Sequence, residues 1–257
     1  MSLARSAVRV LTWNLHAGIG PDGRYDLGRI VGLVQKHDPD IVALQEIDSR
    51  GRGEESPFSF LAQALGSHAA EAKTVVAPDG YYGHALISRW PLGEVAVHDL
   101  SVSRREPRGA IEATVATPLG PLHMASVHLG LSWHERREQA AMLAAIAGTT
   151  RRTTVMLGDF NDWFVFGNVR RSLATLLPAR TKLRTFPARR PLLMLDRVYC
   201  RPASALVKDW TDPEARSMSD HLPVIAEIRL DTGVDASLPG PQPLSVLEPD
   251  PLLPAES

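Results

Sequence analysis

The alternation of apolar and polar positions divides the chain into short strands and a few helices. Apolar, β-branched runs predict strands at residues 8–13 and 41–44, and the apolar residues of 27–37 recur at helical spacing. A strand, a helix and a second strand within the first 46 residues indicate a crossover unit. Further helices are predicted at residues 58–65 and, in an alanine-rich stretch, at 134–147.

Short strands separated by turns fill the middle of the chain. They are predicted at residues 73–77, 84–88, 94–100, 110–117 and 122–128. Strands spaced this closely favour antiparallel pairing. Later strands are predicted at residues 153–157, 193–199, 205–208 and 224–230. The pattern as a whole predicts an α/β (α+β) protein.

The length allows one large domain or two small ones, and the composition points to no particular partner. The chain is 44% hydrophobic and 22% charged, with a net charge of −1. Once the five acids after residue 230 are set aside, 28 basic residues stand against 24 acidic ones. Residues 231–257 are rich in Pro and lack a periodic pattern, so we expect a domain of residues 1–230 followed by a disordered acidic tail.

The cysteine count and the hydropathy pattern bear on the compartment. Cys200 is the single cysteine, so no intrachain disulfide can form. No apolar run approaches the ~18 residues of a membrane span, and residues 1–8 do not resemble a secretory signal. We therefore expect a cytoplasmic protein.

Polar side chains stand where several predicted strands end. Because strand ends meet at one edge of a sheet, their carboxylates would crowd together and repel one another. A divalent cation removes that conflict, and oxygen ligands suit Mg²⁺ or Mn²⁺. Together with histidines that transfer protons, this predicts attack of water on a phosphoester. The residues concerned are Asn14, Glu46, His128, Asp159, Asn161, Asp196, Asp220 and His221.

Several of these residues also have a purely structural explanation when they are taken alone. Asp159 and Asn161 would make an ordinary Asx turn after a strand. His128 would be a hydrogen-bonded core histidine, and Asp196 with Arg197 a surface ion pair. The functional interpretation depends on the set as a whole.

Seven short motifs carry a family resemblance. From residue 8 to about 230 the chain resembles the endonuclease/exonuclease/phosphatase superfamily, and the motifs occur in the order that the superfamily has. They are Thr12-Trp13-Asn14, Gln45-Glu46, Leu86–Pro91, Ser126–Leu129, Gly158–Asn161, Leu195–Val198 and Ser219–Pro223. That group includes deoxyribonucleases, abasic-site endonucleases, inositol-polyphosphate 5-phosphatases and neutral sphingomyelinases. The resemblance implies a four-layer αββα sandwich of two mainly antiparallel sheets flanked by helices, with the active site at a common edge.

The resemblance implies a metal site with Mg²⁺ or Mn²⁺. Glu46 resembles the principal metal ligand, with Asn14 and Asp220 beside it in the metal and phosphate shell. His16 stands where abasic-site endonucleases carry an aspartate. A neutral imidazole there would ligate or bind phosphate, although a hard cation gains less from nitrogen than from oxygen.

Catalytic roles follow from the same resemblance. Asp159 and Asn161 match the pair that orients or activates the attacking water. His221 matches the histidine that contacts the scissile phosphate, and Asp196 matches its carboxylate partner.

Two further residues are implied to bind the phosphate or assist the leaving group. His128 lies where deoxyribonucleases carry a second histidine, but the supporting glutamate of those enzymes has no counterpart near His84. Arg108 resembles a phosphate-facing arginine, with Arg105 as the rival for that position.

The sequence therefore predicts a hydrolase of phosphoric ester bonds, specifically a phosphodiesterase. A basic run at residues 167–190 weakly favours a nuclease acting on DNA, if it forms a phosphate-facing wall rather than a solvated surface. A phospholipid, sphingomyelin or inositol-phosphate hydrolase that recognises a headgroup is the alternative. A non-catalytic phosphate-binding module is the third hypothesis.

Overall fold

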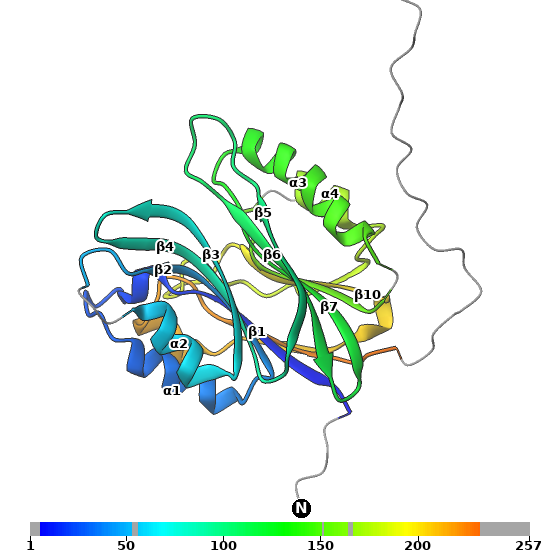
Figure 1. The fold of residues 1–257 in the computed structure, drawn as a ribbon, viewed down its shortest axis with the longest axis horizontal. Coiled ribbons are helices and arrows are strands. Elements are labelled where there is room, and N and C mark those ends of the chain that lie inside the picture. Colours follow the sequence, from blue (N-terminus) through cyan, green and yellow to red (C-terminus); the bar gives the residue numbers. More distant parts are fainter. Residues whose placement is uncertain (1–5, 53–55, 151, 164–166, 232–257) are drawn as a thin grey trace, which may run out of the picture.

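Two six-stranded sheets pack face to face, and helices cover their outer faces (Figure 1). The computed structural model describes residues 6–52, 56–150, 152–163 and 167–231. Four of every five strand pairs in each sheet are antiparallel. The four-layer sandwich expected from the resemblance is therefore confirmed.

The first sheet contains the strands nearest both ends of the described chain. Its order is β11-β12-β1-β2-β4-β3. The strands are β1 (Val8–Asn14), β2 (Ile41–Asp48), β3 (His68–Ala77), β4 (Gly80–Ser88), β11 (Leu206–Trp210) and β12 (Val224–Ile228). β1 and β2 are parallel and are joined through α1 (Leu27–His37), which is the predicted crossover unit.

The second sheet has the same plan. Its order is β5-β6-β7-β8-β10-β9. The strands are β5 (Leu92–Asp99), β6 (Gly109–Thr117), β7 (Gly120–His128), β8 (Thr154–Asp159), β9 (Ala179–Arg180) and β10 (Asp196–Arg201). β7 and β8 are parallel and are joined through α3 (Trp133–Gly148). Each sheet thus contains one parallel pair, whose carboxyl ends lie side by side.

Three apolar clusters hold the layers together. One lies between the sheets and includes Val10, Ile111 and Val155. The second packs α1 and α2 (Pro57–Leu65) on the first sheet, and the third packs α3 and α4 (Asn168–Leu173) on the second. Short 3₁₀ turns complete the elements: η1 (His16–Gly18), η2 (Ala203–Ala205) and η3 (Pro213–Ser217).

The helices begin at residues that satisfy their free N–H groups. The Asp26 side chain accepts the N–H of Arg29 at the start of α1. Ser132 and Glu135 form a reciprocal capping box at the start of α3.

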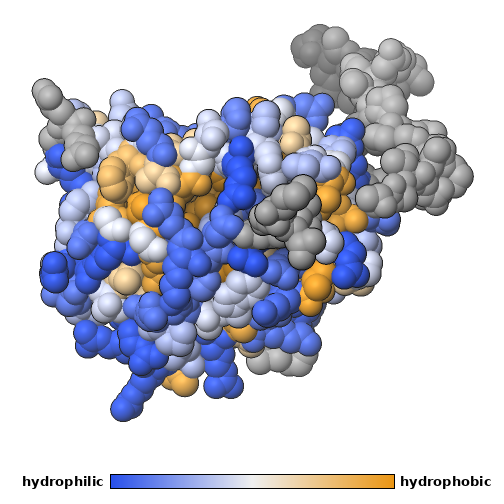
Figure 2. Space-filling view, turned by 90° about the horizontal axis from the view of Figure 1, so that it is seen from below, coloured by the Kyte–Doolittle hydropathy of each residue, from blue (hydrophilic) through white to orange (hydrophobic). Residues whose placement is uncertain are grey.

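No helix in the described ranges has both the length and the apolar character needed to cross a bilayer. Seen from below, hydrophobic groups appear between largely hydrophilic side chains (Figure 2).

The structure differs from the predicted elements in several places. β3 begins at His68 and β4 at Gly80, earlier than the strands predicted at 73–77 and 84–88. The predicted strand at 193–199 begins only at Asp196, because the chain before it folds back and Leu193 bridges to Phe186. The basic run at 167–190, for which no element was predicted, contains α4 and the two-residue strand β9. The predicted tail lies outside the described residues after Asp231.

Candidate active site

The carboxyl ends of the two parallel strand pairs face each other at one edge of the sandwich. Asn14 ends β1 and Glu46 lies near the end of β2, while His128 and Asp159 end β7 and β8. His128 is the direct ladder partner of Asp159, and Asp159 is the partner of Asp196 at the start of β10. The topology therefore gathers these five residues in one place.

Glu46 reaches this edge because β2 is interrupted by a bulge. Leu44 and Ile47 both pack in the cluster beneath α1 and α2, although residues three apart in a regular strand face opposite ways. The register with β4 shifts between them, and Glu46 has a left-handed φ of 56°. In an uninterrupted strand, Glu46 would share the helix-covered face with Leu44.

The turn after β8 is an Asx turn as well as part of the site. The N–H of Asn161 donates to Asp159 Oδ1 at 2.9 Å, and Asn161 Nδ2 donates to the Leu129 carbonyl at 3.0 Å. Gly158 precedes it with a φ of 148°, and a Cβ there would lie 1.9 Å from the Val127 carbonyl oxygen. Asp159 and Asn161 therefore do form the Asx turn that the sequence allowed. The turn uses Asp159 Oδ1 and leaves Asp159 Oδ2 directed to the site.

Asn14 links the two sheets and spaces two carboxylates. Its Nδ2 donates to Glu46 Oε1 at 2.8 Å and to Asp159 Oδ2 at 3.0 Å. Its Oδ1 accepts the backbone N–H of His16 at 3.0 Å. The amide that was predicted to ligate the metal is thus engaged at both ends with protein groups.

His221 is fixed from both its main chain and its ring. Its carbonyl accepts the indole N–H of Trp13 at 2.9 Å, and its N–H donates to Ser219 Oγ at 3.1 Å. Its Nδ1 lies 2.8 Å from Asp196 Oδ2. Burial opposes its charge, but the carboxylates of Asp196 and then Asp159 outweigh burial and raise the pKa of His221 to about 10.

Asp159 itself titrates higher than an ordinary carboxyl group. Burial, and then the nearby charge of Asp196, raise the pKa of Asp159 to about 6. The Nε2 of His221 lies 3.9 Å from Asp159 Oδ2, beyond hydrogen-bond distance. The protonated ring and the carboxylate therefore flank a space rather than bonding to each other.

His128 is buried without a carboxylate bonded to it in the described chain. Its Nε2 lies 3.7 Å from Glu46 Oε1 and 3.9 Å from Asp159 Oδ2. Burial lowers the pKa of His128 well below its usual value, and Arg108 and His84 add to the effect. His128 is thus a neutral imidazole at neutral pH, and its neighbour His84 supplies no carboxylate to support it.

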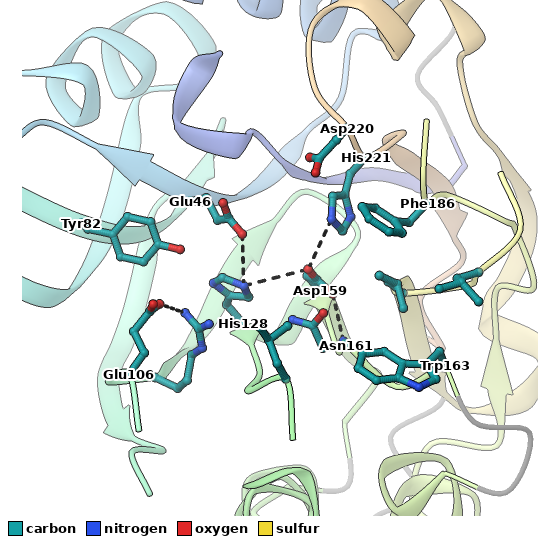
Figure 3. Close-up of a pocket in the computed structure, with 14 residues that line it drawn as sticks. Glu46, Tyr82, Glu106, His128, Asp159, Asn161, Trp163, Phe186, Asp220 and His221 are labelled. Carbon is teal, nitrogen blue, oxygen red and sulfur yellow. Dashed lines mark hydrogen bonds and ion pairs between the residues drawn. The ribbon is translucent and has the colours of Figure 1, made fainter. Parts of the chain in front are cut away.

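A pocket of about 390 Å³ opens among these side chains (Figure 3). Tyr82, Glu106 and Arg108 line one side of it. Arg108 is 93% buried and pairs with the exposed Glu106. Arg105 is exposed and does not line the pocket, so the geometry favours Arg108 over its rival.

The opposite side of the pocket is apolar and was not predicted as a unit. Phe186 packs against His221 with ring centroids 4.8 Å apart, and Trp163 stands beyond Asn161 (Figure 3). No basic residue of the run at 167–190 lines this pocket, which argues against a phosphate-facing wall there. In the sequence these apolar residues look like ordinary core residues. They form the apolar wall of the pocket and are Leu131, Trp163, Phe186, Leu193 and Leu195.

Three carboxylates line the pocket: Glu46, Asp159 and Asp220 (Figure 3). Among the described residues, their ion-pair partners are all histidines, at distances of 3.7, 3.8 and 3.9 Å. Neither Lys nor Arg of the described chain neutralises them. A hard divalent cation fits this donor set, because its preferred ligands are carboxylate oxygens.

A second arrangement of donor atoms is more deeply buried. One ligand atom from each of Asp159, Asp196 and His221 lies within 4.8 Å of the others, so this group could also bind a metal ion. The bond between His221 and Asp196 already engages one oxygen of that carboxylate and one ring nitrogen. The structure thus contains a buried Asp/Asp/His group beside the more open carboxylates.

The two-sheet sandwich with carboxylates and histidines at one edge agrees with the fold that the sequence resemblance implies. The chain matches the Endonuclease/Exonuclease/phosphatase family over residues 11–221 and belongs to that family. The family includes metal-dependent phosphoesterases and nucleases.

Individual relatives support the assignment. The chain is 33% identical over 250 residues to "Uncharacterized protein YbhP" of Escherichia coli (strain K12), covering 86% of this chain and 96% of that protein. An endonuclease/exonuclease/phosphatase from Beutenbergia cavernae DSM 12333 has a similar structure, with a TM-score of 0.70 and 22% identity over 88% of this chain and 72% of that one. The 3′ phosphatase NExo from Neisseria, solved with a product DNA hairpin, has a TM-score of 0.65 and 22% identity over 86% and 99%. The last two likenesses show the shared fold.

Proposed function

We propose that this protein is a divalent-metal-dependent phosphodiesterase in which water attacks phosphorus in line. The observation that carries the proposal is the meeting of Glu46, Asp159 and Asp220 in one space without Lys or Arg from the described chain. A divalent cation would relieve the repulsion between these carboxylates, and carboxylate oxygens are its preferred ligands. Glu46 and Asp220 would hold it, and it would supply charge neutralisation to a phosphate oxygen.

Asp159 is the group that orients and deprotonates the attacking water. Its Oδ1 is committed to the Asn161 N–H, which leaves Oδ2 for the water beside the Asn14 amide. With a pKa of about 6, Asp159 is a stronger base than an exposed aspartate. Asn161 fixes this geometry through its bond to Leu129.

His221 and Arg108 stabilise the negative charge that develops on the phosphate. His221 carries its proton at neutral pH and is aimed by Asp196, so its Nε2–H can donate to a phosphate oxygen. Arg108 brings a buried positive charge to the other side of the pocket. His128, which is neutral, can donate or accept one proton at the leaving group.

The apolar wall supports a nucleic-acid substrate. Trp163 and Phe186 offer aromatic surfaces next to the position of the scissile phosphate, and stacking on such surfaces binds bases without reading sequence. The Neisseria relative binds a DNA hairpin product. A lipid headgroup is the second candidate, because Leu131 at the pocket is 61% exposed and could meet an acyl chain.

A substrate panel tests the proposal. Plasmid DNA, an abasic oligonucleotide, sphingomyelin vesicles and inositol phosphates are incubated with the protein and Mg²⁺ or Mn²⁺, with EDTA as the control. Nicking of DNA that EDTA abolishes is expected, while phosphocholine release without nicking would favour the lipid candidate. Glu46→Gln, Asp159→Asn and His221→Asn should each be inactive, and His134→Ala on the surface of α3 should be normal. Full activity of purified His221→Asn would refute the catalytic assignment.

A further inference from the structure

Glu106 adds a fourth carboxylate to the lining of the pocket, next to Arg108 (Figure 3). It pairs with Nη1 of Arg108, the arginine that the proposed function assigns to the phosphate. The side chain of Glu106 is 52% exposed, whereas that of Arg108 is only 7% exposed. The pair therefore joins a buried cation to a carboxylate that stands between that cation and the solvent.

The backbone of Arg108 is fixed, but its guanidinium is not fully used. The N–H of Arg108 donates to Ser101 Oγ at 3.2 Å, and its carbonyl accepts the Leu100 N–H at 2.9 Å. A guanidinium has five N–H donors, and Glu106 is bonded to Nη1. Arg108 Nε is buried and has no hydrogen-bond partner in the described chain. Arg108 thus keeps donors for a phosphate while Glu106 stays beside it.

The charges around the pocket are balanced against a phosphate that carries little charge of its own. Four carboxylates line the pocket, against two cationic side chains of the described chain and one divalent cation of the proposed function. A phosphodiester brings one negative charge, whereas a phosphomonoester is close to doubly charged at neutral pH, because its second pKa is about 6. The charged lining residues are Glu46, Glu106, Arg108, Asp159, Asp220 and His221.

We infer that Glu106 selects phosphodiesters by repelling the second negative charge of a phosphomonoester. This role rests on the proposed function and narrows its substrate class to singly charged phosphates. Glu106 is paired with the arginine that the phosphate must reach, so its charge lies beside the bound phosphate. Such an element weakens binding of the wrong ligand more than it improves binding of the right one.

The same repulsion favours release of the product. In the proposed reaction the water oxygen bonds to phosphorus, the bond to the leaving oxygen breaks, and that oxygen takes a proton. The phosphomonoester that results ionises a second time near neutral pH. The substrate therefore meets Glu106 with one negative charge and the product meets it with nearly two.

Binding of two small phosphates measures this selection without turnover. The purified full-length chain is titrated in a calorimeter with inorganic phosphate, a dianion at about pH 8, and with dimethyl phosphate, a monoanion, in MgCl₂. Because repulsion scales with the ligand's charge, Glu106→Gln should bind phosphate about tenfold more tightly and dimethyl phosphate only about threefold more tightly. Glu106→Ala should behave like Glu106→Gln, and Glu106→Asp, which keeps the charge, like wild type.

Glu214→Gln is the matched control for these titrations. Glu214 is an exposed glutamate that pairs with Lys36 and does not line the pocket. Its neutral variant should bind both phosphates as wild type does. Equal changes for the two phosphates in folded Glu106→Gln and Glu106→Ala would overturn the inference, because loss of a charge must affect the dianion more.

Steady-state kinetics checks the same selection on esters with one leaving group. Bis(p-nitrophenyl) phosphate is the diester and p-nitrophenyl phosphate the monoester. In Glu106→Gln, kcat/KM should rise about tenfold for the monoester and about threefold for the diester, mainly through KM. A parallel fall for both esters would show that Glu106 only positions Arg108, and this too would overturn the inference.

The role of Glu106 and the proposed function fail in different ways. A wild-type protein that hydrolyses the diester, with unchanged discrimination in Glu106→Gln, refutes the role of Glu106 alone. A wild-type protein that hydrolyses neither ester with Mg²⁺ or Mn²⁺, and no member of the substrate panel, refutes the proposed function and with it the selection. His221→Asn separates these results, because it should lose turnover of both esters whatever Glu106 does.

Discussion

Asn14 Nδ2 donates to Asp159 Oδ2 at 3.0 Å and so joins the last residue of β1 to the last residue of β8 across the two sheets. The same nitrogen donates to Glu46 Oε1. One neutral amide therefore separates two carboxylates that would otherwise repel each other. Its position makes it a spacer for the charged groups of the site.

Replacing this amide with a carboxylate should destabilise the protein when no cation is present. In Asn14→Asp the shared donor becomes a third negative charge, so the free energy of unfolding should fall by about 1–3 kcal/mol in EDTA. MnCl₂ should recover part of the loss, since a cation relieves the repulsion. Urea unfolding measures both values, with exposed Gln63→Glu as the charge-matched control. Equal stability of Asn14→Asp and wild type in EDTA would contradict the spacer role.

Removing the charge of Asp196 while keeping its shape should impair turnover more than folding. Asp196→Asn can still bond to His221 but no longer stabilises the imidazolium. We expect kcat for a phosphodiester to fall roughly 100-fold or more. Steady-state kinetics with a thermal melt checks this, and exposed Asp79→Asn controls for the loss of one carboxylate. An unchanged kcat would show that His221 does not depend on Asp196.

Arg136 should be the main structural link between the loops after β7 and β8. Its buried guanidinium donates to the Gly130 carbonyl at 3.2 Å and lies 3.9 Å from Asp162 Oδ1 and 4.5 Å from the Trp163 ring centroid. Arg136→Met should lower the free energy of unfolding by about 3 kcal/mol, because the buried Asp162 loses one of its neighbouring cations and the Gly130 carbonyl loses its donor. Urea unfolding followed by tryptophan fluorescence tests this.

The neighbouring position supplies the control for that experiment. Arg137 is exposed and lies over Trp133 at 5.9 Å on the outside of α3. Arg137→Met should change the stability little. If both variants lose the same stability, Arg136 does not act through the loops.

His84 should make the fold sensitive to acid. Burial lowers the pKa of His84 to about 4, while an unfolded chain binds the same proton near pH 6.5. Between these values the unfolded state takes up the proton first, so stability is unaffected above about pH 6.5 and falls by roughly 3 kcal/mol as the pH drops to 4. Urea unfolding from pH 7 to pH 4 should show a smaller loss in His84→Gln. Exposed His68→Gln should behave like wild type.

Much of the fold was predictable because its signals are local. The helical spacing of apolar residues such as Ile30 and Val34 predicted α1 with its observed bounds. The apolar runs of β1 and β8 predicted strands that are buried on both faces. The return of β11 and β12 to pair with β1 was not predictable in this way. Such pairing depends on contacts between distant parts of the chain, and a local pattern does not encode them.

The polar members of the site were easier to find than its shape. Carboxylates and histidines at strand ends stand out, as Asp159 does after Gly158. The apolar wall does not, because Phe186 and Leu195 resemble ordinary core residues until the loop before β10 places them at the pocket. The strand predicted at 193–199 was placed too early for the same reason, since β10 runs from Asp196 to Arg201. The roles of the individual site residues remain predictions for the experiments above.

The extra residue of the bulge in β2 presents Glu46 to the site but is not needed for the apolar packing of the strand. Removing Gln45 would restore even pairing with β4 and would still leave Leu44 and Ile47 beneath the helices. Such a shortened chain keeps every large apolar contact of that strand, yet it loses the kink through which Glu46 is presented. A single deletion at this point would thus keep the apolar packing of β2 and remove the carboxylate from the site, because Glu46 would take the buried place of Gln45 beside Thr12.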